Sequence, residues 1–174
     1  MRKAVWLAGL GVLMLATAEM TMFSASGARA DVLKQATREL YAALKNACRQ
    51  QGARLRVNWK KFETWVDITG DGEKDLIWHA TPDAVSCGEA NTGFCGTGGC
   101  SMLVVINRRK SFEFLAHEWT LGRLDDGTPL LVLGIHWAEC NYADACQRIL
   151  KWDPARERFV PIGLLYRPMR DDDD

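Results

Sequence analysis

The sequence lacks an excess of charge of either sign, because its 22 lysines and arginines are matched by 22 aspartates and glutamates. A protein that binds nucleic acid or an anionic membrane surface usually carries a basic surplus, so this balance argues against both classes of partner. Only three histidines are present, and no two of them stand at H-x-x-x-H spacing. Cys-x-x-Cys pairs are also absent, which makes the common structural zinc sites a poor match.

The sequence also lacks an apolar run of the roughly 20 residues that a membrane helix needs. Arg2 and Lys3 precede an apolar run over 4–18, which Glu19 interrupts, and small residues follow as far as Ala30. A basic start, a short apolar centre and an A-x-A end are typical of a secretory signal peptide. We therefore expect residues 1–30 to be removed; an uncleaved anchor is the alternative.

The predicted mature protein begins at Asp31 and is periplasmic or secreted. No cysteine precedes Cys48, so no lipidation site lies near the cleavage point. Without residues 1–30, which hold three basic side chains and one acidic one, the net charge falls from zero to −2. We expect residues 31–170 to form one domain and residues 171–174 to be a disordered acidic tail.

All six cysteines lie in the predicted mature part: Cys48, Cys87, Cys95, Cys100, Cys140 and Cys146. An even number of cysteines in an exported chain indicates disulfides, here three, although six cysteines allow 15 pairings. The favoured pairing joins the two close pairs, Cys95 with Cys100 and Cys140 with Cys146, and leaves Cys48 for Cys87. A zinc site near Cys95 and Cys100 is the alternative.

The pattern of apolar residues changes once along the mature chain, from a helical period to a strand period. Residues 31–52 place apolar side chains three and four apart, which predicts an amphipathic helix that ends at Gly52. After Gly52, short apolar runs alternate with turns, and the runs 102–106 and 130–135 are apolar on both faces. The predicted fold is α+β: an N-terminal amphipathic helix packed on a meandering, mainly antiparallel sheet of six to eight strands, stapled by disulfides.

One acidic stretch stands between two predicted strands and is present in a single copy. Residues 67–75, Asp-Ile-Thr-Gly-Asp-Gly-Glu-Lys-Asp, place carboxylates at loop positions 1, 5 and 9, a hydroxyl at position 3 and glycines at positions 4 and 6. Hard cations such as Ca²⁺ take six to eight oxygen ligands, which such a loop can offer. The alternative is a turn in which aspartate side chains bond backbone amides and no metal binds.

This stretch matches an EF-hand loop only at its start, because the twelfth position is Trp78 and strands flank it in place of helices. Its spacing resembles the calcium loop of FG-GAP and VCBS repeats, D-x-[DNT]-G-D-G-x-x-D. That resemblance implies a structural Ca²⁺ ion of moderate to low affinity. The implied ligands are Asp67, Thr69, Asp71, Glu73 and Asp75. The propeller that such repeats build requires several copies, and this chain has one.

A longer series of motifs resembles a group of small exported bacterial proteins of unknown function. The series comprises Cys-Arg-Gln-Gln-Gly over 48–52, the acidic loop, Phe-Cys-Gly-Thr-Gly-Gly-Cys over 94–100, and a late cysteine pair before the strand hairpin around Trp152. The resemblance covers most of the mature chain. It implies an exported, disulfide-stapled fold and no particular activity.

Two functions remain open at this level. The first is a non-catalytic binding module that contacts a protein or a carbohydrate, since Trp65 falls on the polar face of its predicted strand and aromatic side chains serve such contacts. The second is a periplasmic or secreted hydrolase that uses His117 or His136 with a neighbouring carboxylate, such as Glu118 or Glu139. We favour the binding module and predict no membrane anchor in the mature form.

Overall fold

The computed structural model describes residues 25–88, 94–140 and 145–167. The described chain folds into one long helix, two short helical turns and eleven strands. The helical elements are α1 (Ala25–Gln50), α2 (Trp59–Phe62) and the 3₁₀ turn η1 (Trp137–Cys140). The strands are β1 (Leu55–Val57), β2 (Glu63–Val66), β3 (Asp75–His79), β4 (Val85–Cys87), β5 (Cys95–Gly96), β6 (Gly99–Ile106), β7 (Lys110–Ala116), β8 (Glu118–Arg123), β9 (Pro129–Gly134), β10 (Ala145–Asp153) and β11 (Arg158–Arg167).

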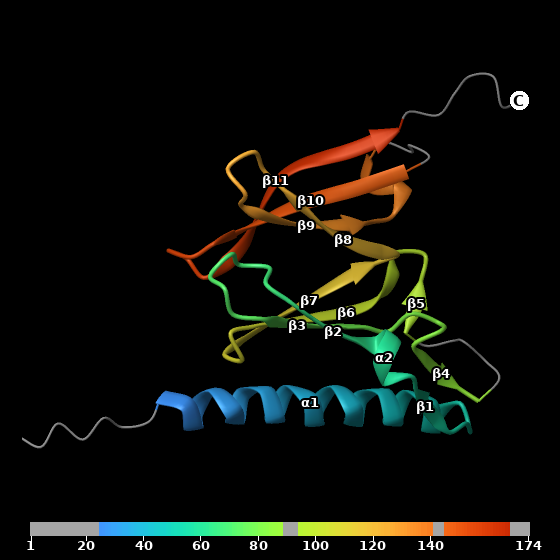
Figure 1. Ribbon diagram of the computed structural model, residues 1–174. Coiled ribbons are helices and arrows are strands. Elements are labelled where there is room, and N and C mark those ends of the chain that lie inside the picture. Colours follow the sequence, from blue (N-terminus) through green and yellow to red (C-terminus); the bar gives the residue numbers. More distant parts are fainter. Residues whose placement is uncertain (1–24, 89–93, 141–144, 168–174) are drawn as a thin grey trace, which may run out of the picture.

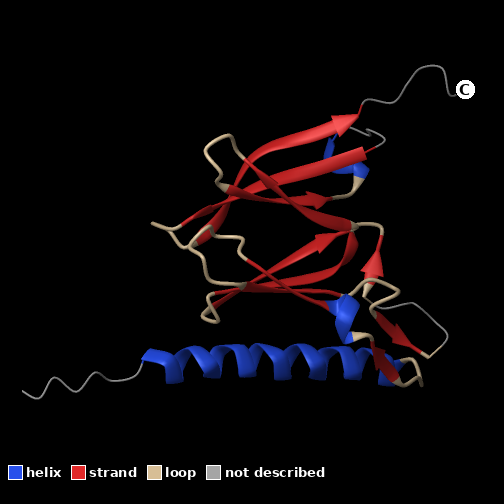
Figure 2. Ribbon diagram, in the orientation of Figure 1, coloured by secondary structure: helices blue, strands red, loops and turns tan. Residues whose placement is uncertain are grey.

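The strands form two main antiparallel sheets and a short ribbon. The first sheet contains five strands in the order β2-β3-β6-β5, with β7 also paired to β6. The second sheet contains four strands in the order β11-β10-β9-β8, and β1 pairs separately with β4. Figure 1 shows α1 lying along one face of the first sheet while the second sheet lies toward its other face. The molecule therefore has three layers: helix, five-stranded sheet and four-stranded sheet (Figure 2).

The two sheets are joined where β7 continues into β8. His117 lies between these strands, and its amide donates to the carbonyl of Gly134 in β9 over 2.8 Å. The chain thus leaves β6 and pairs with β9 without an intervening loop. Gly99 permits this crossing, because its φ is +107° and a Cβ there would lie 2.3 Å from the carbonyl carbon of Ala116.

Apolar side chains are divided between two layers on opposite faces of β3 and β6. Ile77, Met102 and Val104 face the second sheet and pack there with Leu131 and Leu133. The alternate residues of the same strands belong to the layer beneath α1, which comprises Leu44, Phe62, Leu76, Trp78, Leu103 and Val105 with their neighbours. The alternation of a strand sends successive side chains to opposite faces, so one central pair of strands supplies both layers.

The predicted fold class is confirmed: the chain is α+β, with a helix, antiparallel sheet and three disulfides, which join Cys48 to Cys87, Cys95 to Cys100 and Cys140 to Cys146. This is the favoured pairing. The helix ends as predicted, with Gly52 at φ +68° and its amide donating to the carbonyl of Arg49. The predicted signal peptide lies largely outside the described residues, and its proposed end falls within α1. The acidic tail over 171–174 also lies outside them.

The arrangement is richer than the single sheet of six to eight strands that the sequence predicts. The short strands β4 and β5 add to the predicted number of strands. The strands are also divided between two main sheets and a short ribbon. Phe62 is not part of a strand: it ends the helical turn α2, which places it beneath α1, whereas Val66 packs between the sheets. Phe62 and Val66 therefore lie in different apolar layers.

Candidate functional site

The acidic loop connects β2 to β3 and is closed by its own hydrogen bonds. Asp67 accepts from the amides of Gly70 at 2.6 Å and Gly72 at 3.0 Å, one through each carboxylate oxygen. Both glycines have positive φ, +80° and +87°, which other residues rarely adopt. The Thr69 hydroxyl lies 3.4 Å from Asp67, so the first carboxylate organises the whole turn.

Asp75, the last acidic residue of the loop, is also the first residue of β3 and is only 1% exposed. Its two oxygens accept backbone amides from two different segments, Ile68 at 3.0 Å and Asn107 at 2.9 Å. Burial raises the pKa of Asp75, the two amides lower it, and the negative charge of nearby Asp71 raises it. The net effect is a raised pKa, because removal from water disfavours the charged form.

Asn107 joins the acidic loop to the turn between β6 and β7. Its backbone amide bonds to Asp75 and its side-chain Nδ2 donates to Asp71 at 2.8 Å. Burial acts to raise the pKa of Asp71, but the hydrogen bonds from Asn107 and from the Glu73 amide outweigh it and lower that pKa. The Oδ1 atom of Asn107 is buried and has no hydrogen-bond partner among the described residues. Asn107 is not among the residues predicted from the sequence to belong to this site.

All five predicted ligands belong to this one loop. The carboxylates of Asp67, Asp71 and Asp75 already accept hydrogen bonds, both from amides of the loop and from Asn107. Within the described ranges, no three histidine, cysteine, aspartate or glutamate side chains are grouped so as to hold a metal ion. Aspartate-to-amide hydrogen bonds, as in the turn given as the alternative, are present in the loop. An amide bond occupies one lone pair of a carboxylate oxygen and leaves another. Metal ligation and these hydrogen bonds are chemically compatible.

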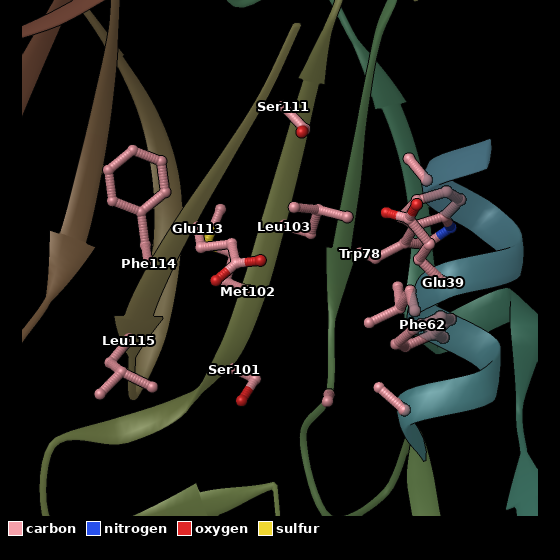
Figure 3. A pocket seen from close by; sticks show the side chains of 14 residues that line it. Glu39, Phe62, Trp78, Ser101, Met102, Leu103, Ser111, Glu113, Phe114 and Leu115 are labelled. Atoms are coloured by element: carbon pink, nitrogen blue, oxygen red, sulfur yellow. The ribbon is translucent and has the colours of Figure 1, made fainter. Parts of the chain in front are cut away.

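A separate cavity of about 470 Å³ lies between α1 and the first sheet. Ala36, Glu39, Leu40 and Ala43 line it from the helix, and residues of β3, β6 and β7 line the facing wall. Figure 3 shows the sheet side chains Leu103, Glu113 and Ser111 on one side and Trp78, Phe62 and Glu39 on the other. Pockets that bind small molecules have volumes of roughly 300–1,000 Å³ and mainly apolar walls.

The cavity exists because the side chains that could fill it are short or polar. On the helix, Ala36 and Ala43 present only methyl groups. On the sheet, Phe112 and Phe114 of β7 pack with the second sheet, although Phe114 also borders the cavity, and the short or polar Ser111 and Glu113 line it. The buried Trp78 and Phe62 form its aromatic end, with their rings stacked at 6.3 Å.

Neither histidine of the hydrolase hypothesis meets a carboxylate within the described residues. His117 is exposed and His136 is half-buried. The Nδ1 atom of His136 accepts the amide of Ala138 at 3.2 Å, and its ring packs on Trp137. Glu139, its proposed partner, forms an ion pair with Arg148 instead. His117 and Glu118 are consecutive and line a shallow pocket beside Gly134.

The third histidine has a structural position. His79 ends β3, is 6% exposed, and its Nε2 lies 3.0 Å from the carbonyl oxygen of Ala116. Burial lowers the pKa of His79, while the Ala116 carbonyl and the charge of Asp83 oppose that shift. The ring therefore braces the point at which the chain passes from one sheet to the other.

The sequence predicts Trp65 on a polar face open to a partner, but this face lies against the apolar layer beneath α1. The indole Nε1 donates to Glu63 at 2.6 Å, and the guanidinium of Arg108 lies 5.7 Å from the ring centre. Its ring packs against the apolar group beneath α1. The half-buried Trp65 is thus part of the apolar layer beneath α1.

No helix in the part of the chain that the structure describes has the length and apolarity of a membrane span. Three disulfides are typical of proteins that fold in an oxidising compartment. Comparison of the chain with protein-family models, curated proteins and solved structures finds no match.

Proposed function

We propose that this chain is an exported, non-catalytic binding module, and that its ligand occupies the cavity between α1 and the five-stranded sheet. One observation carries the proposal: about 470 Å³ of partly open space lies beside the buried side chains of Phe62, Trp78 and Leu103. A space of this size with mainly apolar walls is typical of sites that bind small molecules. The predicted signal peptide and the disulfides support export.

The direct test fills the cavity from the helix. Ala36→Trp places a ring in the space, whereas Ala42→Trp adds the same ring to an exposed position of α1 that does not line it. The neutral probe 4-phenylbutan-1-ol, followed by calorimetry, should bind the wild type and Ala42→Trp. It should not bind Ala36→Trp. Ala43→Trp, on the other lining alanine, should also lose binding, which provides a second variant should one plug prevent folding.

Two results would reject a ligand site in this cavity. One is the absence of binding by the wild type at millimolar probe. The other is equal binding by both plugged variants and the control, which would place the probe elsewhere. Circular dichroism before each titration establishes that the plugged variants are folded.

The acidic loop of this module takes a Ca²⁺ ion in a structural role, with Asp67, Thr69, Asp71, Glu73 and Asp75 as ligands. Three features support it: the donors are all oxygens, the charge of Asp71 disfavours that of Asp75, and a buried amide oxygen of Asn107 is unpaired among the described residues. The ion neutralises this negative charge and fixes the register of β2 and β3.

Calcium titration tests the loop independently of the cavity. Thermal unfolding should shift upward at roughly 10⁻⁴ to 10⁻³ M Ca²⁺, the range of extracellular sites. Asp71→Ala should abolish the shift, and Asp125→Ala, at an exposed turn outside the loop, should retain it. A wild type that gives no shift at millimolar calcium would leave the loop as a hydrogen-bonded turn only.

A further inference from the structure

The charges around the cavity identify the class of ligand. We infer that the pocket selects a small organic cation, an amine attached to an apolar body, and that Glu39 and Glu113 recognise its charge. This inference rests on the proposed function, because it assumes that the cavity is the ligand site.

The walls require an apolar body. Leu40, Leu103 and Leu115 line the space together with the rings of Trp78 and Phe62. Burying the apolar surface of a ligand here gains roughly 25 cal/mol per Å², so an amine without an apolar part would leave most of this gain unused. The helix covers the space, and such partial enclosure suits a small molecule better than the flat surface of a protein partner.

The two carboxylates require a positive charge. Glu39 projects from α1 and Glu113 from β7, so the two approach the space from opposite walls (Figure 3). No lysine, arginine or histidine is among the residues that line the cavity. An anion would therefore face two negative charges without compensation, whereas an ammonium group would find an acceptor on either side.

Neither carboxylate is neutralised within the described part of the chain. Glu39 accepts only a neutral hydrogen bond, from the side chain of Gln35 at 2.8 Å. Glu113 forms no ion pair with any described residue, although several exposed acids elsewhere do, such as Asp83 with Lys61 and Glu157 with Lys110. Ser101 and Ser111 add two hydroxyl oxygens to the same wall, and each can accept a further N–H bond.

The test compares three probes that share one apolar body and differ in charge: 4-phenylbutylamine, 4-phenylbutan-1-ol and 4-phenylbutyrate. Calorimetry at neutral pH and low salt should rank the amine tightest, the alcohol several-fold weaker and the carboxylate weakest. The advantage of the amine should shrink as salt is added, since the carboxylates are accessible to solvent.

Charge-neutral variants then assign the selectivity to residues. Glu39→Gln and Glu113→Gln should each weaken the amine roughly two- to fivefold, as expected for exposed ion pairs, and the double variant should remove most of its advantage over the alcohol. Affinity for the alcohol should not change. Glu118→Gln, which removes an exposed carboxylate outside the cavity, should leave all three affinities unchanged.

The outcomes separate this inference from the proposed function. Equal binding of amine and alcohol, or tighter binding of the carboxylate, would overturn the cation preference and leave the cavity as a ligand site. Amine selectivity that persists in the double variant would overturn the assignment to Glu39 and Glu113. Failure of every probe to bind would reject the cavity site itself.

Discussion

The two apolar layers of this protein share the strands β3 and β6 and differ in how completely they are filled. Between the sheets, Phe112, Phe114, Trp152 and Phe159 form edge-to-face pairs with centroids 5.2–5.7 Å apart, around side chains that are almost fully buried. Beneath α1, about 470 Å³ remains open. In the proposed function, the sheet interface maintains the fold and the helix layer accepts the ligand.

The helix itself is held unevenly. At its C-terminal end, Leu44 and Cys48 are 3% and 0% exposed, and the disulfide to Cys87 fixes this end to β4. Before Leu44, Leu33 and Leu40 are only partly buried, and the cavity lies along residues 36–43 in the middle of the helix. The firmly held end positions the helix, and the looser part borders the proposed ligand site.

Shortening one leucine in each layer should show the largest difference. Leu131→Ala, between the sheets at 1% exposure, should lower the free energy of unfolding by about 2–5 kcal/mol, because a closed core cannot collapse onto the void. Leu40→Ala, beside the cavity, should cost only roughly 1 kcal/mol, since its side chain is partly exposed already. Urea unfolding measures both, and equal losses would show that the two layers are packed alike.

Removing disulfides should sharpen the difference in how the helix is anchored. Cys48→Ala with Cys87→Ala opens a link across 39 residues and should cost roughly 2–4 kcal/mol. Cys140→Ala with Cys146→Ala opens a link across only 6 residues and should cost less, because a short loop gains less freedom in the unfolded chain. Thermal unfolding measures both, and a reversed order would contradict the anchoring role of the first disulfide.

His79, at the junction of the two sheets, should make the free energy of unfolding depend on pH. The buried ring of His79 has a lowered pKa, so the unfolded state takes up a proton at higher pH than the folded state does. Stability should fall as the pH drops from 7 to 5, and His79→Gln should weaken that dependence. His117→Gln, at an exposed histidine, should not. Urea unfolding at both pH values decides, and an unchanged dependence in His79→Gln would assign it to other groups.

The smallest effect should come from the surface pair near the helix layer. Lys61 lies 2.6 Å from Asp83, and this contact with a hydrogen bond from Thr81 lowers the pKa of Asp83 to about 2. The pair should stabilise the fold above pH 3.8 and lose its effect as the pH falls through 2. Its worth should be well under about 1 kcal/mol, because both side chains are more than half exposed. Asp83→Asn measured at pH 5 and pH 2, with and without salt, tests this order of magnitude.

The sequence was sufficient for features that depend on local pattern. The helix stop at Gly52 follows from its need for positive φ, and the doubly apolar runs 102–106 and 130–135 follow from burial on both faces. The disulfide pairing was reachable because two cysteine pairs are close in sequence. The acidic loop was recognisable because its glycines and carboxylates are contiguous.

Features that depend on contacts distant in sequence were not predictable. Asn107 lies 36 residues from Asp71, and only the pairing of β3 with β6 brings its turn to the acidic loop. A signal existed, because asparagine suits a turn residue with positive φ, and Asn107 has φ +49°. The switch between sheets at His117 left no such signal. The cavity depends on which side chains of α1 and β7 face each other, and the periodicity of either segment does not encode that pairing.

The most direct measurement is a map of amide chemical shifts of the mature protein as 4-phenylbutylamine is added. The account predicts that the largest changes fall in two segments, residues 36–43 of α1 and 111–115 of β7, and that strands β9 and β10 of the filled interface remain unaffected. Shifts centred on the second sheet, or no shifts at saturating probe, would contradict the claim that the open layer beneath the helix is the binding site.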